Sequence, residues 1–201
     1  MNINDLKKLS QKKVSVSNIE LLNTIQDKKV RSSEKLTFSF SFFHRENKYF
    51  NLGEVIDNWF IDLLNFLEEL SNLTWIEILT THKSKYDAHG YDGNYNVDIF
   101  NHLYNIFNNG YQQFQCYQIR INKGKGRVHG FLIGNTYYII WLDPNHNMYN
   151  SPGYPKAKKT EKLKSEYELL EDKNTELTQN FDLINQIFND TCNDSCPHKV
   201  N

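Results

Sequence analysis

The sequence lacks several features, and each absence narrows the kind of protein it encodes. Only three cysteines occur among 201 residues, so a framework of disulfides is not expected. No apolar run reaches the roughly 18 residues of a membrane-spanning helix. The first residues, MNINDLKKLSQKK, contain no apolar segment of a secretory signal. We therefore expect a cytoplasmic protein that does not enter a membrane.

Familiar signatures of catalysis and metal binding are also missing. The stretch KGKGRVHG lacks the ending of a phosphate-binding loop and precedes a predicted strand rather than a helix. No GxSxG, HExxH or EF-hand pattern occurs. Cys192, Cys196 and His198 supply at most part of a zinc site, and His82 and His89 are too far apart for a metal pair on one helix. We expect neither a metal nor a cofactor.

Charge is unevenly distributed, although the net charge is only −1. Residues 115–159 carry seven Lys or Arg against one Asp or Glu, and residues 1–35 carry eight against four. Residues 36–114 and 160–201 are acidic. A local cationic block suits an anionic ligand bound at one place, although a well-solvated hairpin would also carry such a block.

Hydrophobic periodicity predicts an α+β protein. Residues 36–43 alternate apolar and polar side chains, as in a half-buried strand. Residues 52–70 and 97–107 have helical spacing, and residues 73–79 fit either a strand or a helical turn. The polar segment 81–96 is expected to be a loop. Three regions follow: a polar N-terminal arm over 1–35, an α+β domain over 36–150, and a linker with an acidic, polar C-terminal helix over 151–201.

The segment from Gln115 to Tyr149 predicts a meander of three antiparallel strands. The strands are expected over residues 115–122, 127–133 and 136–142, with a Gly-rich turn between the first two. Gly134-Asn135 is a two-residue hairpin signal, and Asp143-Pro144-Asn145 ends the last strand with a turn. We expect a mostly antiparallel sheet that packs on helices with one face.

The other face of this sheet carries the candidate chemistry. Arg127 and His129 are two residues apart on one strand and share a face, and Arg120 of the neighbouring strand can lie opposite them. Such a group suits metal-independent RNA cleavage by internal transesterification, in which protons move and a guanidinium stabilises the phosphorane. An ordinary exposed polar face is the alternative.

His146 and Tyr149 follow the last strand. His146 is a candidate general acid or base because its ordinary pKa lies near physiological pH, and a turn histidine bonded to backbone is the alternative. In RNA cleavage we expect His146 to act as the general acid, with His129 or a lysine as its partner. Tyr149 is a candidate phosphate donor or stacking platform. The lysines expected to contact flanking RNA phosphates are Lys83, Lys85, Lys123 and Lys125.

The phrase RVHGFLIGNTYYIIWLDPNHNMY resembles the RelE/ParE toxin superfamily, in particular mRNA interferases of the RelE, YoeB and HigB type. Those toxins place a basic residue before the first hairpin turn, an arginine at the start of the next strand, and a histidine or tyrosine after the last. Here Arg120 or Lys123, Arg127, and His146 with Tyr149 occupy those places. The resemblance implies a RelE-like fold, cytoplasmic cleavage of mRNA, often on the ribosome, and neutralisation by an antitoxin protein.

Other hypotheses remain open from the sequence. The acidic C-terminal segment could fold back over the basic meander and restrain its binding of RNA. The chain could instead be a non-enzymatic interaction protein of a phage or mobile element, which would hold a protein partner on its aromatic-rich sheet. DNA binding by the basic hairpin ranks last because no helix-turn-helix pattern accompanies it.

Overall fold

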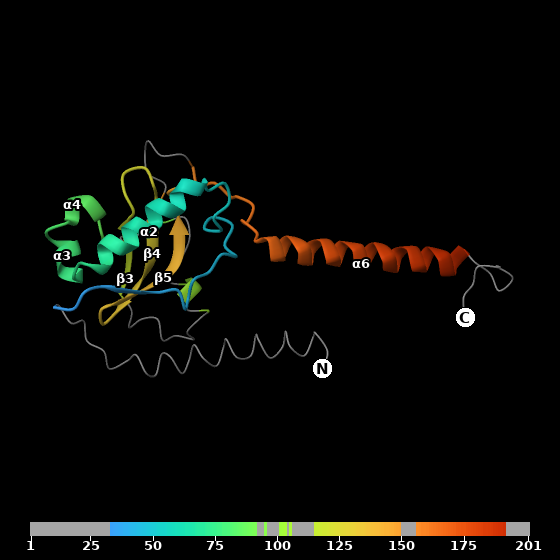
Figure 1. The fold of residues 1–201 in the computed structure, drawn as a ribbon, viewed down its shortest axis with the longest axis horizontal. Coiled ribbons are helices and arrows are strands. Elements are labelled where there is room, and N and C mark those ends of the chain that lie inside the picture. The colour runs from blue at the N-terminus through green and yellow to red at the C-terminus, as the bar shows by residue number, and fades with distance from the viewer. Residues whose placement is uncertain are drawn as a thin grey trace. The chain divides into compact units, whose positions relative to one another are not determined.

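The computed structural model describes residues 33–91, 95, 101–103, 105, 115–149 and 156–191 (Figure 1). They form an α+β unit that ends at Lys162 and a helical unit that begins at Leu163. The predicted α+β class and C-terminal helix are thus confirmed. The polar arm expected over 1–35 lies almost entirely outside the described residues. So does most of the helix expected over 97–107, of which residues 101–103 and 105 are described and are helical.

The α+β unit is built on a five-stranded sheet with the order β1-β5-β4-β3-β2. The predicted meander is present, and its three strands pair in antiparallel fashion. β1 pairs with β5 in parallel and makes the sheet mixed, and β2 extends the opposite edge from a segment expected to be a loop. The strands are β1 (Thr37–Ser39), β2 (His89–Gly90), β3 (Gln115–Arg120), β4 (Arg127–Ile133) and β5 (Thr136–Asp143).

Glycines make both turns of the meander possible. Gly134 has a φ of 61°, and Gly126 has a φ of 93° at the end of the first turn. Glycine adopts this left-handed region without a steric penalty. A Cβ at Gly126 would also lie 2.1 Å from the carbonyl oxygen of Asp143, so this turn packs closely against the end of β5.

The first strand is shorter than predicted. β1 ends at Ser39, and a turn follows in which the Phe43 amide donates to the Phe40 carbonyl at 3.0 Å. Phe40 is 48% exposed, whereas Phe42 is buried on the opposite side of the sheet from Leu36. The alternation predicted over 36–43 is therefore wrong beyond β1, because the turn redirects the side chains.

The main helix, α2 (Asp57–Ser71), crosses one face of the sheet (Figure 1). It begins five residues later than the start predicted at residue 52, because Leu52 and Glu54 both have positive φ values of 63°. Its end at Ser71 agrees with the predicted break. The side chains that it buries recur at helical spacing, namely Trp59, Leu63, Phe66 and Leu70.

Two short helices follow. The segment 73–79, left open between strand and helix, contains α3 (Trp75–Leu79). Thr74 and Glu77 form a capping box that satisfies backbone amides at its start. α4 (Lys83–Tyr86) lies where a loop was expected and ends at Asp87, which has a left-handed conformation.

Hydrophobic clusters lie on both faces of the sheet. Under α2, side chains of alternate strand positions such as Val128 and Leu142 join the helix residues. On the other face, Phe131 and Trp141 pack with Phe42 and Phe50 from the segment that follows β1. The second face is thus covered in its centre, and polar groups gather near Arg127, where β4 starts and β5 ends.

A short extended segment, residues 156–162, ties the end of the α+β unit to the rest of it. The Thr160 amide donates to the Lys48 carbonyl at 3.0 Å, and Asn51 Nδ2 donates to the Thr160 carbonyl at 2.6 Å. These bonds are made by residues that the sequence assigned to a linker. The C-terminal unit therefore begins beyond the fixed segment.

The C-terminal helix, α6 (Glu166–Thr191), lies within the region 151–201 in which a linker and a helix were predicted. Ser165 and Glu168 explain the start, because Ser165 Oγ accepts from the Glu168 amide and the Glu168 carboxylate accepts from the Ser165 amide. None of its side chains is buried. Within the described residues, no helix is both long and apolar enough to cross a membrane.

Candidate functional site

The predicted cations meet in one row across the meander. Arg120 of β3 is paired with Arg127 of β4, and Arg127 is paired with Asp143 of β5. Residues directly opposite each other project from the same face of a sheet. The structure therefore places both guanidinium groups and the one carboxylate of the meander on the face away from α2.

Arg120 has its own carboxylate partner. Its guanidinium forms an ion pair with Asp87 and also donates to the Ser84 carbonyl at 3.2 Å. Both partners belong to the α4 segment, so Arg120 fastens α4 to β3. Arg127 instead donates to the carbonyl of Gly126 at 3.1 Å and is half-buried.

His129 lies one row further along β4 and is completely buried. Its Nδ1 is 2.7 Å from the Tyr91 hydroxyl, and its Nε2 is 3.4 Å from the Asp143 carboxylate. Burial raises the pKa of Tyr91 well above its ordinary value, so the phenol stays protonated. If the Tyr91 hydroxyl donates to Nδ1, the ring donates to the Asp143 carboxylate from Nε2, so His129 links the two side chains.

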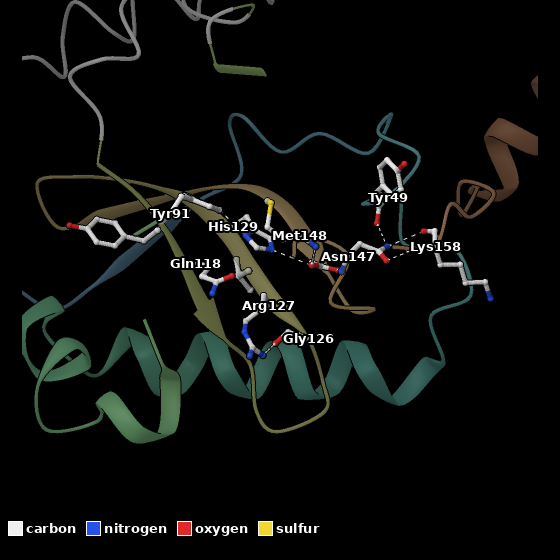
Figure 2. A network of polar contacts seen from close by, with 12 residues as sticks. Tyr49, Tyr91, Gln118, Gly126, Arg127, His129, Asn147, Met148 and Lys158 are labelled. Atoms are coloured by element: carbon white, nitrogen blue, oxygen red, sulfur yellow. Dashed lines mark hydrogen bonds and ion pairs between the residues drawn. The ribbon is translucent and has the colours of Figure 1, made fainter. Parts of the chain in front are cut away.

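Asp143 holds the loop after β5 in a curled conformation. Its two carboxylate oxygens accept from the backbone amides of Asn147 at 2.7 Å and Met148 at 3.0 Å, in addition to the contact with His129 (Figure 2). Carboxylates often stabilise a turn by accepting from amides a few residues later. Asp143 is fully buried and acts here as an anchor for the segment 144–148.

His146 lies in that loop and is half-buried. It has a left-handed φ of 57°, a conformation that non-glycine residues adopt infrequently. The pKa of His146 is lowered from its ordinary value, first by burial and then by the positive charge of Arg127. His146 is thus a neutral imidazole at pH 7, placed within the electrostatic reach of Arg127, and it is better suited to accept a proton than to donate one.

Asn147, beside His146, locks this loop to two other segments. Its Nδ2 donates to the carbonyls of Tyr49 at 2.8 Å and Lys158 at 3.1 Å, and its Oδ1 accepts from the Lys158 amide at 2.9 Å (Figure 2). Its side chain therefore joins chain segments that are remote in sequence. This network fixes the backbone beside His146 from both sides.

Tyr149 and Gln118 border the group. Tyr149 stacks on Tyr91 with ring centroids 6.4 Å apart and is half-buried. Gln118 is paired with His129 across β3 and β4, and its Nε2 donates to His89 Nε2. The labelled side chains of Gln118, Arg127 and His129 lie on the same side of the sheet (Figure 2).

The four candidate lysines have different surroundings. Lys85 forms an ion pair with Glu69 at 2.6 Å, and Lys125 forms one with Asp62 at 3.0 Å, so both are paired with carboxylates of α2. Lys123 in the β3–β4 turn and Lys83 in α4 are exposed.

Sequence reasoning did not single out Tyr91 or Asn147. Nothing in the pattern around Tyr91 distinguishes it from other tyrosines, because its role depends on a contact with a residue far along the chain. Asp143 was noticed as the single carboxylate of the meander and as the start of a turn with Pro144-Asn145. Its role as an anchor for the following loop could have been inferred from that turn signal but was not.

No cluster of three or more His, Cys, Asp or Glu suited to a metal ion occurs in the part of the chain that the structure describes. The sequence and fold were also compared with known proteins. No family model, curated protein or solved structure matches this chain.

Proposed function

We propose that this protein is an endoribonuclease that cleaves RNA by metal-independent transesterification. One observation carries the proposal: His146, whose pKa is lowered by burial and by the charge of Arg127, lies in a loop that Asp143 and Asn147 hold by hydrogen bonds. A neutral imidazole next to a guanidinium is a suitable pair for a phosphodiester, because one group takes a proton and the other binds the negative charge.

In this proposal His146 removes the proton of the ribose 2′-hydroxyl. The 2′-oxygen then bonds to phosphorus, and Arg127 stabilises the charge-rich phosphorane. The bond from phosphorus to the 5′-oxygen breaks, and that oxygen takes a proton from an exposed lysine, for which Lys123 is our candidate. The products are a 2′,3′-cyclic phosphate and a 5′-hydroxyl.

His129 has a different part in this scheme from the one that the sequence suggested. Because it is completely buried, it positions Asp143, and through Asp143 the loop of His146, rather than touching RNA. Arg120 likewise acts through α4, since Asp87 neutralises it. Tyr149 remains the candidate platform for a neighbouring base.

The order of elements supports a RelE-like mRNA interferase as the biological form of this activity. A strand, then helices, then the meander β3–β5 followed by His146 is the order on which the resemblance rests. The proposal then includes a cytoplasmic toxin of a toxin–antitoxin system, with mRNA as substrate, possible action on the ribosome, and an antitoxin as protein partner.

The test uses purified full-length protein and a short RNA in the presence of EDTA. We expect cleavage that leaves a cyclic phosphate and that stops when the 2′-hydroxyl at the cleaved position is replaced by hydrogen. Arg127→Ala should lower the rate by about 10²–10³-fold and His146→Ala by about 10²–10⁴-fold. Lys48→Ala, which removes an exposed charge elsewhere, should retain the rate. Cleavage that survives both site substitutions would refute the proposal.

A non-enzymatic interaction protein remains the second candidate. The aromatic-rich sheet face expected to hold a partner is covered, since Phe42, Phe50 and Trp141 are buried there. Exposed apolar side chains occur instead on α2, where Ile61 and Leu64 are 58% and 60% exposed. This candidate predicts that Arg127→Ala and His146→Ala leave the biological effect intact, whereas charged residues at these two α2 positions abolish it.

A further inference from the structure

α6 carries an apolar stripe with a seven-residue repeat. From Tyr167 onward, the stripe returns at alternating intervals of three and four residues, so its average period is the 3.5 residues of a left-handed coiled coil. The helix is 26 residues long and spans about four such repeats. The stripe consists of Tyr167, Leu170, Asn174, Leu177, Phe181, Ile184 and Phe188.

The stripe is exposed along its length. Tyr167 is 70% exposed, Leu177 is 56% exposed and Phe181 is 64% exposed, and α6 buries none of its side chains. An amphipathic helix owes most of its stability to packing of its apolar face against another element. A partner for this stripe is therefore required to make α6 a stable helix.

The polar member of the stripe indicates what the partner is. In heptad notation Tyr167, Asn174, Phe181 and Phe188 take position a, and the leucines and Ile184 take position d. A single asparagine at position a is poorly matched to an apolar side chain but pairs with its own counterpart through amide hydrogen bonds. The two asparagines meet only when two copies run parallel and in register.

Charge placement is compatible with self-association. α6 contains seven Asp or Glu and one Lys, yet most of its acidic residues lie at the outer positions b, c and f, away from the seam. Glu166 at position g and Glu171 at position e flank the seam, and in a parallel pair they face each other across the two copies. The repulsion between these two carboxylates destabilises the dimer only slightly, because solvent screens it.

We propose that α6 forms a parallel, two-stranded coiled coil with α6 of a second copy of this chain, with Asn174 paired to Asn174. The six apolar stripe residues, each with roughly 100 Å² to bury, would remove about 1,200 Å² from the pair, the lower limit for a specific interface. This dimer does not depend on the proposed nuclease activity.

The first test measures the mass of the full-length protein by sedimentation equilibrium over a series of concentrations. Wild type should dimerise, and Leu177→Glu should be monomeric. Leu169→Glu is the matched control, because Leu169 is 54% exposed, against 56% for Leu177, but lies at position c outside the seam. A monomeric wild type, as expected if α6 folds back on its own chain, would overturn the proposal, as would equal effects of both substitutions.

The second test examines the orientation. In the parallel arrangement, Glu171 of one copy faces Glu166 of the other, and Glu171→Lys converts this repulsion into attraction. The dissociation constant of the dimer should then fall by about tenfold. Glu176→Lys makes the same charge change at the outer position c and should tighten the dimer much less. A dimer that responds equally to both changes would contradict the parallel, in-register arrangement.

Discussion

Arg120 and Arg127 are direct cross-strand partners on β3 and β4, although both are positively charged. Like charges at opposed positions destabilise a sheet unless other groups compensate. Asp87 compensates Arg120 through an ion pair, and Asp143 is the register partner of Arg127 on its other side. Of the two arginines, Arg127 has the larger effect on the pKa of His146, so Arg127 is the arginine that we assign to an incoming phosphate.

The lowered pKa of His146 predicts a pH profile for RNA cleavage. A base works in its neutral form, and its pKa in the folded protein lies below 6.5, so the rate should be constant near pH 7 and fall only at lower pH. Arg127→Gln should lower the rate and also move this acidic limb to higher pH, because a positive charge that lowers the pKa is removed. Cleavage measured from pH 4.5 to pH 8 (about the range in which histidines titrate) provides the readout.

Lys123→Gln is the control for that profile. It removes a charge from the neighbouring turn, and Lys123 is not among the groups that shift the pKa of His146. This variant should lower the rate without moving the acidic limb. An identical limb in Arg127→Gln and wild type would show that His146 is not the titrating base.

Asp143→Asn should destabilise the protein by about 2–4 kcal/mol. The amide that replaces the carboxylate has one accepting oxygen, so a buried backbone amide of Asn147 or Met148 loses its partner. Asp62→Asn is the matched control, since its partly exposed ion pair with Lys125 should contribute less than about 1 kcal/mol. Urea unfolding measures both. Equal losses would indicate that Asp143 does not anchor the loop.

The two glycines of the β3–β4 turn should respond very differently to alanine. At Gly126 a Cβ would meet the Asp143 carbonyl oxygen at 2.1 Å, so Gly126→Ala should cost more than about 3 kcal/mol or prevent folding. No atom lies within 4 Å of the corresponding position at Gly124, whose φ is 79°. Gly124→Ala should therefore cost only the roughly 1–2 kcal/mol of a left-handed alanine. Thermal unfolding of the two variants compares them.

His102 should make the folded state sensitive to acid. Its ring lies 4.7 Å from that of His44 and 4.8 Å from that of Trp141, and burial lowers its pKa from 6.5 to about 4. Protonation then favours the unfolded state, so stability present above pH 6.5 is lost as the pH falls toward 4. The loss is at most about 3 kcal/mol.

His102→Phe keeps an aromatic ring at this place and removes the imidazole that takes up the proton. The free energy of unfolding in urea should then decline less between pH 6.5 and pH 4 than it does in wild type. His82→Phe, outside the His44–His102–Trp141 cluster, should follow the wild-type decline. If the free energy of unfolding declined equally with pH in wild type and in His102→Phe, His102 would not be the residue that makes the folded state sensitive to acid.

The sequence by itself determined the parts of the fold that depend on local preferences. Gly134-Asn135 can form a tight turn without strain, and the alternation along residues 127–133 assigns Arg127 and His129 to one face. The repeat along α6 is equally local. These features follow from backbone sterics and from the period of each element, so they could be read before the structure.

Only the tertiary structure determined which groups each side chain contacts. Alternation placed His129 on a face but could not show that this face is covered, with Tyr91 and Asp143 on the two ring nitrogens. In the same way, the pairing of Arg120 with Asp87 joins residues 33 positions apart. The period of an element indicates the direction in which a side chain points. The burial and the pKa of that side chain depend instead on remote segments that fold against it. Contacts with such segments distinguish His146 from the other histidines that the structure describes.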